Sequence, residues 1–207
     1  MKILVLIIVI SVLSFAQEND SDLNFIYHFP HSQDSLLIKG YKFNESPLHI
    51  YASEFYVINC NTEDTLIFFG ALQNCTIIKN GYSLSVIESK YVPEPFDNKW
   101  INKNYLKYNF NLSSDNKITI DTTFIFYPYI FTIQDELKHL KEYDEIKNSS
   151  KNISEELIYY ILYMALNDES PAIKILFNMK DELQLDGSIS EVNSVAINIY
   201  KTYLKLK

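Results

Sequence analysis

The sequence predicts an α+β protein, in which an N-terminal antiparallel β-sheet or sandwich of six to eight short strands precedes a C-terminal segment of three to four helices. From about residue 23 to residue 127 apolar residues recur with a period of two, and from residue 132 onward the period becomes 3.6. The connections between the predicted strands are too short for a parallel crossover, which makes the sheet antiparallel. We therefore divide the chain into an antiparallel β region, 17–131, and a helical region, 132–207, and expect the helices to pack on the sheet as one unit.

The first 16 residues have the layout of a cleaved secretory signal peptide. Lys2 supplies a positive charge, Ile3–Leu13 is apolar apart from one serine, and Ser14-Phe15-Ala16 places small residues where a signal peptidase cuts. As a helix, this apolar run rises about 16 Å, which is too short for the ~30 Å hydrocarbon core of a membrane. We expect cleavage after Ala16, export to the periplasm or the outside of a bacterium, and no membrane insertion of the mature protein.

The predicted strands are short runs of alternating residues bounded by turn residues. The most regular is Lys117–Tyr127, in which alternate apolar side chains lie on one face. Asn80-Gly81 predicts a two-residue type I′ hairpin turn, because these residues adopt positive φ angles most easily. The remaining strands are predicted at Leu36–Lys39, Leu48–Tyr51, Phe55–Cys60, Asp64–Phe69, Thr76–Lys79, Tyr82–Ile87 and Tyr105–Leu112.

Capping signals mark the starts of the helices. Acidic residues three positions after a Thr, Asn or Ser form capping boxes, and Pro171 follows Ser170 at the first position of a helix, where proline is favoured. In order, the predicted caps and ends are Thr132 to about Lys147, Asn152 to about Asn167, Ser170 to Leu183, and Ser188 to about Leu206.

Composition excludes several classes of partner. The 18 basic residues are all lysine and stand against 26 acidic residues, which gives a formal net charge of −8. Such a chain lacks a basic face to neutralise phosphates, so nucleic acid is disfavoured as a partner. Four glycines leave no Gly-rich loop for a nucleotide, and we predict no cofactor. An acidic surface instead speeds the encounter with a basic protein.

The two cysteines, Cys60 and Cys75, would meet an oxidising compartment after export. If residues 54–60, 64–69 and 75–79 form a simple meander, the cysteines lie at opposite ends of the middle strand, about 17 Å apart. A disulfide tolerates a Cα separation of roughly 7 Å. The cysteines therefore either remain thiols or pair through strands of two facing sheets.

No metal site and no catalytic residue are predicted. His28 and His31 flank Pro30 with no third ligand nearby, and His49 and His139 are isolated. Motifs for a serine or cysteine nucleophile are missing. A hydrolase of sugars needs two carboxylates at a defined separation, and the candidates for this alternative are Glu54, Asp64, Glu88, Glu94 and Asp97.

Aromatic residues give the remaining indication of a binding site. The loop Pro93–Trp100 is stiffened by two prolines and contains the only Trp of the chain. Exposed aromatic residues of this kind are typical of binding hot spots, whereas a loop folded back would use Trp100 to cover the edge of the sheet. The candidate binding residues are Tyr91, Phe96, Asp97, Trp100 and Tyr105.

These observations predict an exported, non-catalytic binding or inhibitory protein of the bacterial envelope, whose partner is a basic protein or a glycan. A concrete form is an immunity-type protein that occludes a secreted toxin or a cell-wall hydrolase. The alternatives are an envelope hydrolase that uses carboxylates on strand ends or loops, and a carbohydrate-binding or structural accessory of a surface complex.

Overall fold

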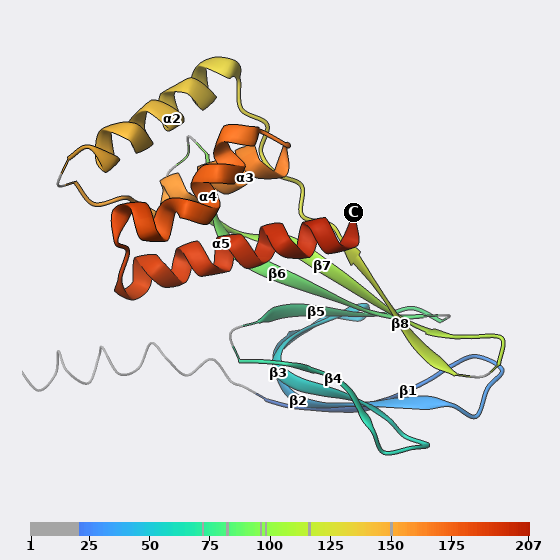
Figure 1. The fold of residues 1–207 in the computed structure, drawn as a ribbon. Coiled ribbons are helices and arrows are strands. Elements are labelled where there is room, and N and C mark those ends of the chain that lie inside the picture. The colour runs from blue at the N-terminus through green and yellow to red at the C-terminus, as the bar shows by residue number, and fades with distance from the viewer. Residues whose placement is uncertain are drawn as a thin grey trace, which may run out of the picture. The chain divides into compact units, whose positions relative to one another are not determined.

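The computed structural model describes residues 21–207 except 72, 82, 96, 98, 116 and 150, so the predicted signal peptide lies outside the described residues. The fold is α+β, with an eight-stranded antiparallel sheet followed by four helices among the described residues (Figure 1). The chain forms two compact units. Unit 1 contains Lys107–Thr122 and the residues up to Ser89, and unit 2 contains Lys90–Leu106 and Thr123–Lys207.

The strands follow one another along the sheet in the order β1-β2-β3-β5-β6-β7-β8, and β4 pairs with β3 outside this path. β3 is the branching point, because its residues 49–52 pair with β5 and its residues 55–58 pair with β4. β2 lies along the other edge of β3. The strands are β1 Ser21–His28, β2 Ser35–Glu45, β3 His49–Asn59, β4 Thr65–Phe69, β5 Asn74–Lys79, β6 Leu84–Glu94, β7 Lys99–Leu112 and β8 Ile118–Phe124.

A β-bulge bends β3 at Glu54. The register pairs Gly40 of β2 with Phe55 and Tyr41 with Ser53, which leaves Glu54 as the extra residue. Glu54 has a φ of 49°, and its N–H donates to the Gly70 carbonyl at 3.4 Å, where β4 has ended. Position 40 requires glycine, because a Cβ there would lie 2.3 Å from the Glu54 carbonyl oxygen.

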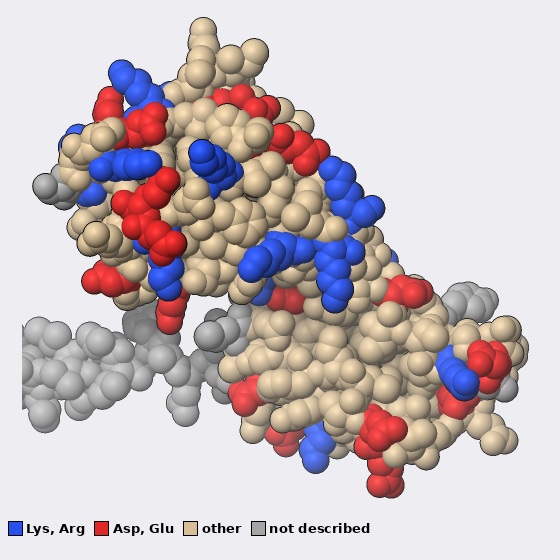
Figure 2. Space-filling view, viewed as in Figure 1, with Lys and Arg blue, Asp and Glu red and all other residues tan. Residues whose placement is uncertain are grey.

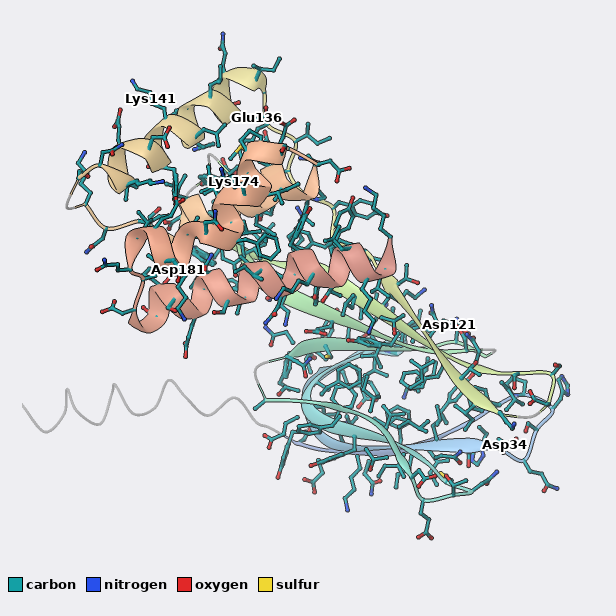
Figure 3. All side chains as sticks on the ribbon, viewed as in Figure 1. Asp34, Asp121, Glu136, Lys141, Lys174 and Asp181 are labelled. Atoms are coloured by element: carbon teal, nitrogen blue, oxygen red, sulfur yellow. The ribbon has the colours of Figure 1, made fainter. Side chains whose placement is uncertain are left out.

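The core of unit 1 is formed by the side chains on one face of the sheet, which we call the inner face. Period-two alternation turns every second side chain of β2 and β3 inward, and the rings of Phe55 and Phe69 stack at 4.7 Å between centroids. At one end, the Asp34 carboxylate, labelled in Figure 3, accepts hydrogen bonds from Ser32 Oγ at 2.7 Å and from Asn61 Nδ2. The buried residues include Leu23, Leu36, Ile38, Ile50, Ala52, Val57, Ile77, Leu84, Val86 and Phe110.

One turn prediction is wrong. Lys79 pairs with Leu84 across the β5–β6 hairpin, so its loop has four residues instead of the two predicted at Asn80-Gly81. The reason is that the Asn80 side chain closes the turn itself: its Oδ1 accepts from the Ser83 N–H at 2.7 Å. Residues 54–60, 64–69 and 75–79 do not form a simple meander either, because β4 and β5 both pair with β3.

Unit 2 contains the helices α2 Ile133–Lys147, α3 Glu155–Leu166, α4 Ser170–Leu183 and α5 Gly187–Leu206. The predicted capping box of α2 is confirmed, with Thr132 Oγ1 accepting from the Asp135 N–H at 3.2 Å. α4 begins at Ser170 with Pro171 in its first turn, but its cap is Glu169 in place of the predicted Ser170. Two further caps differ from the prediction: Ser154 caps α3 in place of Asn152, and Asp186 precedes α5 in place of Ser188.

α3 is the central helix of unit 2 and packs against the other three helices. Residues Leu157–Leu166 are all buried apart from Tyr160, which is half-buried. The terminal parts of β6 and β7 belong to this unit because they contact α3: the Tyr163 hydroxyl donates to the Pro93 carbonyl at 3.0 Å. The boundary between the units therefore lies within β6, β7 and β8, whereas the period of the sequence changes near residue 131.

Within the described residues, no helix has the length and apolar character needed to cross a bilayer.

Candidate functional site

The outer face of the sheet in unit 1 carries a group of exposed aromatic side chains. We call it the outer aromatic face and define it by Tyr41, Phe43, Tyr51, Tyr56 and Phe68, whose exposed fractions lie between 38 and 48%. Tyr56 and Phe68 are directly opposite each other on β3 and β4, and their rings stack at 4.5 Å. Exposed aromatic rings gathered on one face are typical of contact surfaces.

This aromatic surface follows from the strand register. Leu36 and Ile38 of β2 point into the core, so the alternation turns Tyr41 to the other face. Phe43 is the extra residue of a second register shift, because Lys42 pairs with Ala52 and Asn44 with Tyr51. On β3, Ile50 and Ala52 point inward, which turns Tyr51 outward beside Phe43, with the ring centroids 6.4 Å apart. Both strands thus bury one set of apolar side chains and expose another.

A hollow of about 640 Å³ opens at the bulge between β1, β2, β3 and β4. We call it the bulge hollow. The extra residue Glu54 brings a carboxylate to its wall, as bulges re-aim side chains at functional sites, and Tyr41 and Tyr56 supply aromatic walls. The lining residues are Asp22, Leu23, Asn24, Lys39, Gly40, Tyr41, Glu54, Tyr56, Ile58 and Thr65.

Four polar side chains around the bulge hollow are available to a ligand. Within the described part of the chain, Asp22, Asn24, Lys39 and Glu54 make no side-chain hydrogen bond and no ion pair with another residue. They come from three strands, and the register sets Asn24, Lys39 and Tyr56 in one row across the sheet. The hollow therefore combines aromatic surface with hydrogen-bonding groups that the fold leaves unused.

A second hollow, of about 490 Å³, lies in unit 2. It differs from the bulge hollow because two of its charged side chains, Lys147 and Glu182, already pair with each other. Its Glu182 carboxylate receives the Tyr143 hydroxyl at 2.8 Å and the Lys147 ammonium at 2.9 Å. These partners hold the pKa of Glu182 below its ordinary value. The charged groups of this hollow thus already fix the end of α4 to α2, which makes it a structural contact.

The predicted binding residues near Trp100 are divided between surface and interior of unit 2. Tyr91 is exposed and lies 5.5 Å from the Trp100 ring, while Trp100 itself is half-buried and meets Tyr159 of α3 edge-on at 5.8 Å. Tyr105 is only 6% exposed and packs on Phe124. Asp97 is exposed, and Phe96 lies outside the described residues. The structure therefore brings Tyr91 and Trp100 together and turns Tyr105 inward.

The carboxylates proposed for a hydrolase are dispersed. Glu54 lines the bulge hollow, and Asp64 precedes β4 in the turn that follows β3. Glu88 is buried in unit 1, where the Tyr108 hydroxyl donates to it at 3.2 Å. Glu94 and Asp97 belong to unit 2. Of these five residues, the described structure places one, Glu54, at the bulge hollow.

No disulfide joins Cys60 and Cys75. Cys75 is opposite Ala52 near the start of β3, whereas Cys60 follows the last residue of the same strand. The cysteines are thus separated by most of the length of β3, which a disulfide cannot span. Among the residues that the structure describes, no three His, Cys, Asp or Glu side chains gather as a metal site.

His139, which the sequence predicts to be an isolated histidine, is buried. It lies in unit 2, 4% exposed, between the rings of Phe131 and Tyr160 at 5.1 and 4.8 Å. Neither ring nitrogen has a hydrogen-bond partner among the described residues, since Glu142 Oε2 is 3.7 Å from Nδ1. Burial lowers the pKa of His139, although the nearby Glu142 and Asp135 carboxylates oppose this shift and Lys138 adds to it.

We expect unit 2 to lose stability in mild acid because of His139. Its pKa is lower in the folded than in the unfolded chain, so below an unfolded pKa of about 6.5 the unfolded chain binds the proton first. The free energy of unfolding should then fall as the pH drops below this value and through the folded pKa. Urea midpoints of Trp100 fluorescence at several pH values measure this loss.

His139→Phe keeps an aromatic ring beside Tyr160 and removes the titration, so its midpoint should change less with pH over the same interval. An equal decline in wild type and variant would show that other groups cause the loss.

The outer aromatic face and the bulge hollow were missed because β2 and β3 were predicted too short. The sequence does carry a signal, since apolar residues occupy both phases of the alternation from Leu36 to Phe43 and from Ile50 to Val57.

Figure 2 shows lysines and acidic residues interspersed on the visible face, with no extended basic surface. No protein-family model, no curated protein and no solved structure matches this chain.

Proposed function

We propose that this chain is an exported, non-catalytic binding protein of the bacterial envelope, and that it holds its ligand on the outer aromatic face of unit 1. The observation that carries the proposal is the exposure of five aromatic side chains on one face of β2, β3 and β4. Aromatic residues dominate the energy of binding interfaces because their large rings lose water at a small cost in conformational entropy.

The net charge favours an inhibitory form of this function. With 26 acidic residues against 18 basic ones, the chain attracts basic partners within about one Debye length, beyond which salt screens the charges. A secreted toxin or a cell-wall hydrolase with a basic surface would meet this field. Occlusion of its cleft is the immunity-type mechanism that the sequence predicts, and we assign the occluding surface to the outer aromatic face.

The test is capture of envelope components on the immobilised protein, followed by analysis of both protein and sugar. We expect the wild type to retain one component in stoichiometric amount, and Tyr56→Ala with Phe68→Ala to retain at least about tenfold less, since central aromatic contacts contribute more than 1 kcal/mol each. The matched control is Tyr127→Ala, which removes a ring that is 77% exposed in unit 2.

Support requires that the component, once purified, rebinds the wild type and not the double variant. If the double variant retains as much as the wild type, the outer aromatic face is not the binding surface. If the protein instead turns over the component, the non-catalytic function is wrong.

A further inference from the structure

We propose that the bulge hollow binds a neutral oligosaccharide. The inference rests on the proposed binding role of the outer aromatic face and assigns the bulge hollow a glycan as ligand, alongside the basic protein. It is argued from three properties of the hollow: its aromatic walls, its unused polar groups and its charge.

The aromatic walls match the apolar faces of a sugar ring. A pyranose presents C–H groups on its faces, and these groups pack on the π-face of an aromatic side chain. Tyr41 and Tyr56 line the hollow with exposed fractions of 48 and 43%. The Tyr56 ring is supported from the side by its stack with Phe68, so a sugar would meet a ring that is already held in place.

The polar groups match the hydroxyls at the rim of a sugar ring. A hydroxyl both donates and accepts hydrogen bonds, so it requires acceptors and donors in its neighbourhood. Asp22 and Glu54 supply acceptors, Lys39 supplies a donor, and the Asn24 amide supplies both. Because these side chains have no side-chain partner within the described residues, a ligand would break no existing contact to reach them.

The volume and the charge of the bulge hollow narrow the class of sugar that it can bind. About 640 Å³ falls within the range of roughly 300 to 1,000 Å³ that small-molecule sites occupy. Two carboxylates against one ammonium make the hollow negative, which disfavours uronic acids, sulfated sugars and phosphorylated sugars. A neutral chain of a few sugars, with one unit on Tyr41 and the next on Tyr56, fits these properties.

Calorimetric titration of the purified protein tests the inference. The probes are cellotetraose, chitotetraose, xylotetraose and mannotetraose as neutral ligands, and tetragalacturonic acid as the acidic one. We expect one of the neutral probes to bind, Tyr41→Ala to raise its Kd at least tenfold, and Tyr41→Phe to keep most of the affinity. Glu54→Ala should raise the Kd several-fold, and Tyr127→Ala should leave it unchanged.

Each outcome bears on one of the two proposals. Circular dichroism of Tyr41→Ala checks that the variant is folded, so that a lost affinity reports the site. A stronger affinity for tetragalacturonic acid, or neutral binding that survives Tyr41→Ala, overturns the inference. If no sugar binds while a protein is captured through Tyr56 and Phe68, the inference fails and the proposed function stands. If neither binds, both fail.

Discussion

Gly40→Ala should destabilise unit 1 by about 3 kcal/mol or more, which is large for the addition of one methyl group. The new Cβ would lie 2.3 Å from the Glu54 carbonyl oxygen and 2.5 Å from the Phe55 Cα. Both atoms belong to the backbone of β3, so no side-chain rotation relieves the overlap. β2 and β3 would have to separate at the bulge, and the row of buried side chains through Leu23 and Phe55 would separate with them.

Urea unfolding followed by far-ultraviolet circular dichroism measures this loss. Hydrogen exchange on peptides that cover residues 36–58 assigns it to β2 and β3. The matched control is Gly81→Ala in the β5–β6 loop, where an added Cβ has no atom within 4 Å, and we expect its effect to stay within about 0.5 kcal/mol. Equal stabilities for Gly40→Ala and Gly81→Ala would show that the strands tolerate a wider separation.

Tyr163→Ala should cost unit 2 about 3 to 5 kcal/mol, the usual loss for an aromatic side chain removed from a core. Tyr163 is 1% exposed at the centre of α3. Its ring stacks on Phe126 at 5.9 Å, and the Lys103 ammonium lies 5.3 Å from its centroid. Burial lowers the pKa of Lys103, although the nearby Glu94 carboxylate opposes this shift. The vacated space would leave a cavity that the rigid neighbours cannot fill.

Tyr163→Phe separates the contribution of the ring from that of the hydroxyl, and Leu204→Ala is the control. Tyr163→Phe keeps the ring but leaves the buried Pro93 carbonyl without its 3.0 Å hydrogen bond, so we expect a loss of about 1 to 2 kcal/mol. Leu204→Ala removes a leucine that is 53% exposed on α5 and should change little. Trp100 is the only tryptophan and contacts α3, so its fluorescence follows unit 2 during unfolding. A loss below 1 kcal/mol for Tyr163→Ala would mean that the cluster is not a core.

The helices could be predicted from the sequence because their signals are local. A cap and the side chain it receives lie three residues apart, as Thr132 and Asp135 do, and a proline fixes its own φ wherever it stands. The three errors, at α3, α4 and α5, are shifts of about one or two residues between neighbouring polar side chains.

The arrangement of the strands depends on distant residues and was less predictable. Leu48–Tyr51 and Phe55–Cys60 read as two strands, because Ala52-Ser53-Glu54 interrupts the apolar run. In the structure they are one strand with a bulge, and Gly40 allows that bulge from 14 residues away along the chain. The outer aromatic face depends on the same register, so sequence reasoning found the Trp100 loop and missed Tyr41 and Tyr56.

The division of the chain has a consequence for how the protein is made. Unit 1 is built from two separate stretches, and Lys90–Leu106 between them belongs to unit 2. While synthesis proceeds from the N-terminus, β1 to β5 emerge early, yet unit 1 is incomplete until residue 122 has left the ribosome. For the same reason no single protease cut releases either unit whole, so the two units must be produced together as one chain.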